Sequence, residues 1–125
     1  MNSNYATGLQ HVGIPTKRLG ISVDFYKKLG FKVYFRSNNV VFMKLNALLI
    51  ELYINSNTSR KAGTIDHISL NVKDIESAFS EFRSSGFKIL DSEIKSLPFF
   101  ENGVRFFTIE GPNGEKIEFN ELIKK

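Results

Sequence analysis

The chain contains one motif twice, as His11-Val-Gly-Ile-Pro-Thr-Lys17 and, 56 residues later, as His67-Ile-Ser-Leu-Asn-Val-Lys73. The match continues without a gap, from residues 23–32 to residues 79–88, and both of these stretches end in Gly-Phe-Lys. The identical positions are His11/His67, Lys17/Lys73, Gly30/Gly86, Phe31/Phe87 and Lys32/Lys88. A repeat of this length indicates two copies of one structural unit.

The two copies match again near their ends, at an offset of 67 residues. Leu49-Ile-Glu-Leu-Tyr53 aligns with Lys116-Ile-Glu-Phe-Asn120, which pairs Glu51 with Glu118. The second copy is therefore eleven residues longer between its predicted helix and its last strand. We expect this extra length to lie in a loop or in a longer hairpin.

Each copy predicts a strand, a helix and three further strands. Period-two alternation predicts the strands, Asp74 is the expected N-cap of the second helix, and Gly30 and Gly86 are expected just past the two helix ends. In the first copy we expect strands at residues 10–15, 31–36, 40–45 and 48–54 and a helix at 21–29. In the second copy we expect strands at 67–72, 88–92, 104–109 and 116–121, a helix at 75–85 and the longest irregular loop at 95–103.

These elements predict an α+β fold with two tandem βαβββ modules. The modules span residues 9–55 and 65–122, and together they form one domain, 9–122. We expect them to build a cupped, mostly antiparallel sheet. A chain of 125 residues with 42% hydrophobic residues is long enough to form such a core.

Composition excludes several classes of function. The chain has no cysteine, which removes disulfides, thiolate ligands and cysteine nucleophiles. The net charge of +4 comes from scattered pairs of basic residues, so we expect no nucleic-acid interface. No apolar run approaches the roughly 20 residues of a membrane span, and the first eight residues lack the pattern of a signal peptide. We therefore expect a cytoplasmic protein with no membrane contact.

The only two histidines of the chain each open one copy of the repeat. Because successive strand residues point to opposite faces, the apolar residues that follow His11 and His67 should pack on the helices, and the imidazoles should project from the other face. Glu51 and Glu118 each lie between two apolar residues, so their carboxylates should project from that same face. The four side chains thus form two equivalent sets.

Two imidazoles and two carboxylates predict a site for one divalent metal ion, held by His11, Glu51, His67 and Glu118, within the cup of the sheet. This donor set suits Ni, Zn, Co, Mn or Fe alike. Taken singly, a histidine at a strand start is more often a packing or capping residue, and a glutamate in an apolar strand can pair with a basic side chain. Their recurrence at matched positions favours the metal site over a duplication that has lost its metal.

The pattern resembles the vicinal oxygen chelate superfamily, which includes glyoxalase I, bleomycin and fosfomycin resistance proteins, epimerases and extradiol dioxygenases. The resemblance covers residues 9–122 and includes Phe25-Tyr-Lys-Lys-Leu-Gly-Phe31 and Gly111-Pro-Asn-Gly-Glu-Lys-Ile-Glu-Phe119. The order His, Glu, His, Glu is most similar to bacterial glyoxalase I, in which all four residues bind the metal.

The resemblance implies a lyase or isomerase, similar to lactoylglutathione lyase, that moves a proton between adjacent carbons of an α-oxo thiol adduct or similar small molecule. It implies Glu118, and second Glu51, as the catalytic base, Asn55 as a contact for the thiol part of the substrate, and a homodimer. Glyoxalase I enzymes usually carry arginines where this chain has Pro15 and, in some members, Gly63. The alternatives are a thiol transferase or epimerase on the same scaffold, or a metal-free resistance protein that binds a drug or metabolite.

Overall fold

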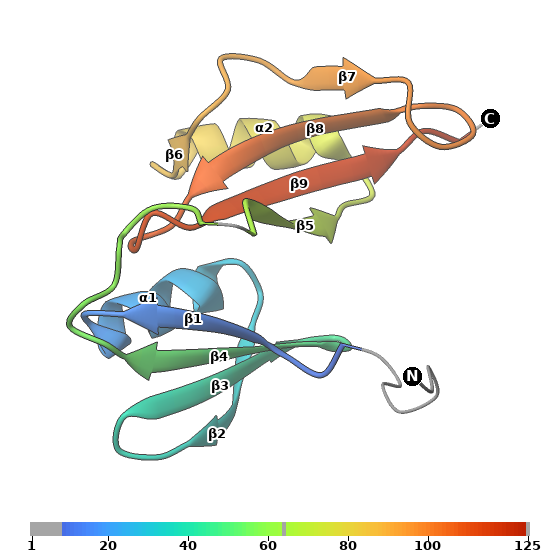
Figure 1. The fold of residues 1–125 in the computed structure, drawn as a ribbon. Helices are drawn as coiled ribbons and strands as arrows, with labels where there is room; N and C mark the ends of the chain where they lie inside the picture. Colours follow the sequence, from blue (N-terminus) through green and yellow to red (C-terminus); the bar gives the residue numbers. More distant parts are fainter. Residues whose placement is uncertain (1–8, 64, 125) are drawn as a thin grey trace. The chain divides into compact units, whose positions relative to one another are not determined.

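A computed structural model describes residues 9–63 and 65–124 and confirms the α+β fold of two βαβββ modules (Figure 1). The elements of the first module are β1 (Val12–Thr16), α1 (Leu19–Lys28), β2 (Lys32–Arg36), β3 (Val40–Leu45) and β4 (Leu48–Ile54). Those of the second are β5 (His67–Asn71), α2 (Ile75–Ser84), β6 (Lys88–Ile89), β7 (Lys95–Leu97), β8 (Val104–Glu110) and β9 (Lys116–Leu122). The chain divides into two compact units, Met1–Thr58 and Ser59–Lys125. Neither helix among the described residues is long and apolar enough to cross a membrane.

The first unit is a four-stranded sheet in the order β1-β4-β3-β2, with α1 against one face. β1 runs parallel to β4, whereas β3 is antiparallel to both β4 and β2. Alternation decides which side chains form the core: Val41, Met43, Ile50 and Leu52 have no exposed surface, and Tyr26 of α1 is equally buried. The residues between them on β3 and β4 therefore face away from the helix.

The second unit repeats this arrangement, with strand order β5-β9-β8-β6 and α2 against the sheet. β5 is parallel to β9, and β8 is antiparallel to β9, β6 and β7. The core of this unit is aromatic. Phe107 is fully buried, stacks on Phe119 at a centroid distance of 5.3 Å, and meets Phe79 and Phe82 edge-on at 5.1 and 5.9 Å. Such ring pairs stabilise a core beyond the area that they bury.

The helix ends follow the predicted chemistry. Asp74 caps α2, since its Oδ1 accepts a hydrogen bond of 3.2 Å from the backbone of the third helical residue. Gly30 and Gly86 follow the helix ends with positive φ angles of 102° and 80°, which glycine adopts without strain. α1 begins at Leu19, two residues earlier than predicted, because Ser22 N already donates to the carbonyl of the residue before Leu19.

In the longer part of the second copy, the structure differs from the prediction in two places. The strand predicted at 88–92 has only the two residues of β6, because Asp91 Oδ2 accepts a 2.7 Å hydrogen bond from Thr108 N and thereby replaces a main-chain partner. The segment 95–103, predicted to be irregular, begins with β7, which pairs with the start of β8. The chain then returns to β8 through Gly103, whose φ is 88°.

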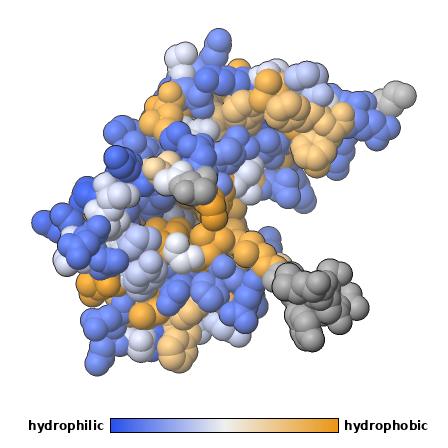
Figure 2. Space-filling view, viewed as in Figure 1, coloured by the Kyte–Doolittle hydropathy of each residue, from blue (hydrophilic) through white to orange (hydrophobic). Residues whose placement is uncertain are grey.

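Each unit also exposes some aromatic surface. Figure 2 shows polar residues over much of the visible face, interrupted by apolar patches. Tyr34 and Phe35 on β2 are 63% and 56% exposed, and Phe99 and Phe100 in the loop after β7 are 54% and 78% exposed. The exposed aromatic side chains thus lie on an edge strand of one unit and on a loop of the other.

Candidate functional site

In the first unit, His11 and Glu51 lie side by side on the sheet face that points away from α1. Glu51 lies on β4 between two fully buried residues, so alternation turns its carboxylate away from the core. His11 directly precedes β1, which is the parallel neighbour of β4. Nε2 of His11 is 3.4 Å from Oε1 of Glu51, and the two side chains are 32% and 28% exposed. Phe42 of β3 meets the imidazole edge-on, with ring centroids 5.5 Å apart.

The second unit holds the matching pair. His67 is the first residue of β5, and Glu118 lies on β9 between the buried Ile117 and Phe119. Nε2 of His67 is 3.7 Å from Oε2 of Glu118, and the two side chains are 42% and 15% exposed. As in the first unit, histidine and glutamate project from one face of two parallel neighbouring strands. The glutamate is the more buried member of this pair.

Glu118 has two further partners that the sequence analysis did not single out. Ser69 Oγ donates a 2.7 Å hydrogen bond to Oε1, and Asn120 Nδ2 donates one of 3.1 Å to the same oxygen. The repeat places Gly13, which has no side chain, and Tyr53 at the corresponding positions of the first unit, and among the described residues neither donates a side-chain hydrogen bond to Glu51. The hydroxyl and the amide therefore orient the carboxylate of the second unit only.

The Nδ1 atoms of the two histidines also have partners. Gln10 Oε1 lies 3.1 Å from His11 Nδ1, and Asp66 Oδ2 lies 3.0 Å from His67 Nδ1. The other oxygen of Asp66 accepts a 3.0 Å bond from Lys116 Nζ. Hydrogen bonds from His67 and then from Lys116 lower the pKa of Asp66 below its ordinary 3.8. Sequence reasoning passed over these two neighbours, although the repeat offset of 56 aligns one with the other.

The structure brings together His11 with Glu51, and His67 with Glu118, each pair within its own unit. Among residues 9–63 and 65–124, no group of three or more His, Asp or Glu side chains is arranged so that it could hold a metal ion. Each unit thus supplies two of the four predicted ligands. The chemistry of the donors fits a divalent cation, because imidazole nitrogen and carboxylate oxygen both donate electron pairs to such ions.

Asn55, the predicted substrate contact, follows directly after β4 and is exposed. Its backbone N donates to Thr16 O at 3.0 Å, and its side-chain Oδ1 accepts from Asn57 N at 2.9 Å. The side-chain oxygen therefore closes a local turn at the start of the linker. This turn fixes the residue at the end of the strand that carries Glu51.

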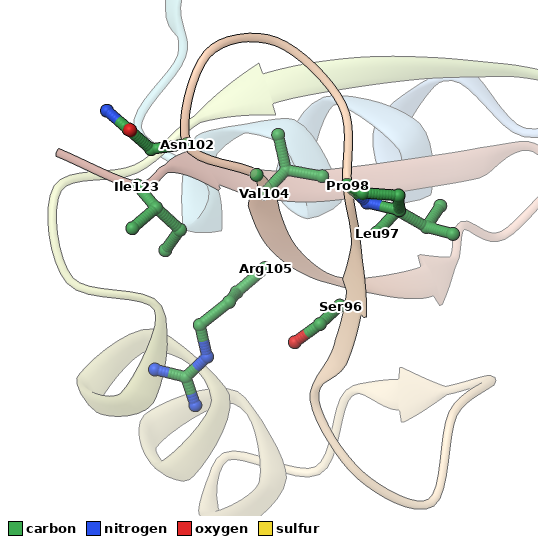
Figure 3. Close-up of a pocket in the computed structure, with 8 residues that line it drawn as sticks. Ser96, Leu97, Pro98, Asn102, Val104, Arg105 and Ile123 are labelled. Carbon is green, nitrogen blue, oxygen red and sulfur yellow. The ribbon is translucent and has the colours of Figure 1, made fainter. Parts of the chain in front are cut away.

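A separate surface cavity of 460 Å³ lies in the second unit (Figure 3). It is formed by β7, the following loop and the start of β8, and its apolar lining includes Leu97 and Ile123. Arg105 extends toward α2 (Figure 3) and contacts Glu76 there at 2.6 Å. Neither member of the His–Glu pair lines this cavity, so it is not part of the candidate metal site.

The fold and the repeated His–Glu pair define a class of protein. The model of the Glyoxalase/Bleomycin resistance protein/Dioxygenase superfamily matches residues 8–119, a span that includes all four ligand-type residues. The chain therefore belongs to this superfamily. Among its relatives is the uncharacterized protein YwbC of Bacillus subtilis (strain 168), which is 34% identical over 127 residues that cover 91% of this chain and 97% of YwbC.

Solved structures agree with this assignment at the level of the fold. The fosfomycin resistance protein FosX from Listeria monocytogenes superposes with a TM-score of 0.75 and 14% identity, covering 94% of this chain and 95% of that one. Lactoylglutathione lyase from Agrobacterium tumefaciens superposes with a TM-score of 0.72 and 15% identity, covering 94% and 96%. At such identities the similarity shows a shared fold alone.

Proposed function

We propose that the protein is a metal-dependent enzyme of the glyoxalase type, in which His11, Glu51, His67 and Glu118 hold one divalent ion. The observation that carries this proposal is the repeated pair: each unit turns one imidazole Nε2 and one carboxylate toward each other, at 3.4 and 3.7 Å, on the open face of its sheet. Two such pairs around one ion form a complete ligand set for Ni, Zn, Co, Mn or Fe. When bound, the ion supplies the Lewis acidity that stabilises negative charge on two adjacent substrate oxygens.

Glu118 is the proposed catalytic base, and Glu51 is the second candidate. Ser69 and Asn120 hold Oε1 of Glu118, which leaves Oε2 to take a proton from one carbon and return it to its neighbour. The Glu118 side chain as a whole is 15% exposed, so water has limited access to its carboxylate. The proposed substrate is an α-oxo thiol adduct or a similar small molecule with two adjacent oxygens, and Asn55 is its proposed contact.

The two pairs are proposed to meet in a homodimer, with the first-unit pair of one chain facing the second-unit pair of the other. Subunit mixing tests this arrangement. A His11→Ala/Glu51→Ala chain and a His67→Ala/Glu118→Ala chain should each bind no metal alone, and their heterodimer should regain one intact site. Mixed chains that regain no metal, or a protein that sediments only as a monomer, would contradict the shared site.

A second candidate function, a metal-free protein that binds a drug or metabolite, is favoured by an aromatic row beside the first pair. Phe42 lies edge-on to His11 at 5.5 Å, and Phe35 lies 6.3 Å from Phe42 and is 56% exposed. These three rings continue from the His–Glu pair to the edge of the sheet, and they offer a flat apolar molecule a binding surface that needs no metal.

Metal content separates the two candidates. Untagged protein, purified without chelators and incubated with Ni, Co, Mn and Zn salts, should contain about one ion per four-residue site by plasma mass spectrometry. His67→Ala and Glu118→Ala should lose it, whereas Glu93→Gln, which removes an exposed carboxylate elsewhere in the same unit, should keep it. Absence of metal from the wild type under all four conditions would refute the metalloenzyme and favour the binding protein.

A further inference from the structure

The residue before each histidine contacts the ring nitrogen that faces away from the glutamate. Gln10 Oε1 lies 3.1 Å from His11 Nδ1, and Asp66 Oδ2 lies 3.0 Å from His67 Nδ1. These contacts are equivalent in the two copies, because the offset of 56 that pairs the histidines also pairs the residues before them. The same arrangement thus occurs in both units with two different side chains.

These contacts determine where the proton of a neutral imidazole lies. A carboxylate or amide oxygen only accepts hydrogen bonds, so each contact requires the hydrogen on Nδ1. In a neutral ring the lone pair then lies on Nε2. Nε2 is the atom that faces Glu51 at 3.4 Å in one unit and Glu118 at 3.7 Å in the other. Both rings therefore present an electron-pair donor beside a carboxylate.

We propose that Gln10 and Asp66 are positioning residues that hold His11 and His67 with hydrogen on Nδ1 and direct Nε2 to the metal. The inference rests on the proposed function, since the same ion is the ligand. Outer residues that bond to the second nitrogen of a metal-binding histidine fix its tautomer and orientation. Neither residue would touch the substrate, and both would act through the histidine beside them.

The two positioning residues are unequal in strength. Asp66 is anionic and is itself held by Lys116 at 3.0 Å, and the Cα atoms of Lys116 and His67 are partners across β5 and β9. Gln10 is neutral and exposed. Because hydrogen bonds to ionised groups are stronger than those between neutral groups, His67 is held more firmly than His11. Loss of Asp66 should therefore weaken metal binding more than loss of Gln10.

The tautomers can be read directly, since the untagged chain has only two imidazoles. Long-range ¹H–¹⁵N spectra of metal-free, ¹⁵N-labelled protein at pH 8.5, well above the ordinary imidazole pKa of about 6.5, should show both rings with hydrogen on Nδ1. Asp66→Ala should shift only His67 toward the Nε2–H form, and Gln10→Ala should shift only His11. Asp66→Asn keeps an accepting oxygen and should retain the wild-type tautomer. Unchanged backbone amide spectra serve as the folding control.

Metal titration of the same samples completes the test. Asp66→Ala should lower the affinity about 10- to 100-fold, Asp66→Asn less, and Glu93→Gln not at all. Tight metal binding by a protein whose rings carry hydrogen on Nε2, or rings unaffected by Asp66→Ala, would overturn the positioning role and leave the proposed function standing. Rings with the expected tautomers in a wild type that binds no metal would refute the proposed function, and with it the positioning of Nε2 toward an ion.

Discussion

Ser69 offers a direct test of how the second unit prepares its carboxylate. Its hydroxyl donates a 2.7 Å hydrogen bond to Glu118 Oε1, whereas Gly13, its counterpart in the first unit, has no side chain to offer Glu51. A hydrogen bond to a charged group contributes about 1.5–3 kcal/mol, and the lower value applies because Ser69 is exposed. Because the bond can be present both before and after the ion binds, its full energy is an upper limit, and Ser69→Ala should weaken metal binding by up to about 1.5 kcal/mol, or up to roughly tenfold in Kd.

The reciprocal change supplies the matched variant. A Cβ atom added at Gly13 would lie 3.7 Å from Glu51 Oε1 and 3.5 Å from Tyr53, which are ordinary van der Waals distances. Gly13→Ser should therefore be accommodated and should give Glu51 the hydroxyl that it lacks. The combination of Gly13→Ser with Ser69→Ala should bring the Kd back toward the wild-type value.

Isothermal titration of metal-free protein, with the metal found by mass spectrometry, measures these differences, and thermal melts of each variant control for folding. A Kd that is unchanged in Ser69→Ala would show that the hydroxyl does not prepare Glu118 for the ion. A Gly13→Ser variant that melts normally but binds metal at least tenfold more weakly would refute the equivalence of the two positions.

Three further predictions concern stability. Phe107→Ala should lower the free energy of unfolding, measured in urea, by about 3–5 kcal/mol, because the ring is fully buried. Phe99→Ala should change it by less than about 0.5 kcal/mol, because that ring is 54% exposed. Equal losses in the two variants would contradict the aromatic core. Hydrogen bonds from the third residue of α2 lower the pKa of Asp74 below 3.8. The stabilisation that the charged cap gives the folded state should therefore be complete above pH 3.8 and should be lost as the pH falls through the lower folded-state pKa. Asp74→Ala should remove this pH-dependent stabilisation, and a loss of stability that is independent of pH would contradict the cap. Gly114→Ala should destabilise the second unit in thermal melts, because φ is 81° and the new Cβ would overlap the carbonyl of Arg60; an unchanged melting temperature would count against this contact.

The repeat made most of the fold predictable from the sequence. The predicted strands 40–45 and 48–54 coincide with β3 and β4, because their alternation is uninterrupted and short turns bound them. The short β6 and the additional β7 could not be predicted in this way. Their extents depend on the contact of Asp91 with Thr108 and on pairing with β8, and neither long-range contact leaves a local periodic signal.

For the candidate site, the sequence revealed the ligand-type residues but not the residues that support them. His67 and Glu118 were identifiable because their types and positions recur in both copies. The contacts of Asp66, Ser69 and Asn120 depend on the rotamers of polar side chains, which alternation does not encode. The repeat still draws attention to these three positions, because at each of them the first copy carries a different residue type.

The differences between the two copies all leave the ligand-type side chains of the second unit more firmly held than those of the first. Glu118 accepts two hydrogen bonds, whereas only His11 pairs with Glu51 among the described residues of the first unit, and His67 is held by an anion. Because a preorganised donor pair loses less conformational entropy on binding, the ion should engage the second pair first, and that pair should set the affinity. In metal titrations, His67→Ala should therefore raise the Kd more than His11→Ala does. Equal losses in the two variants would mean that the half-sites remained equivalent after duplication, despite their different surroundings.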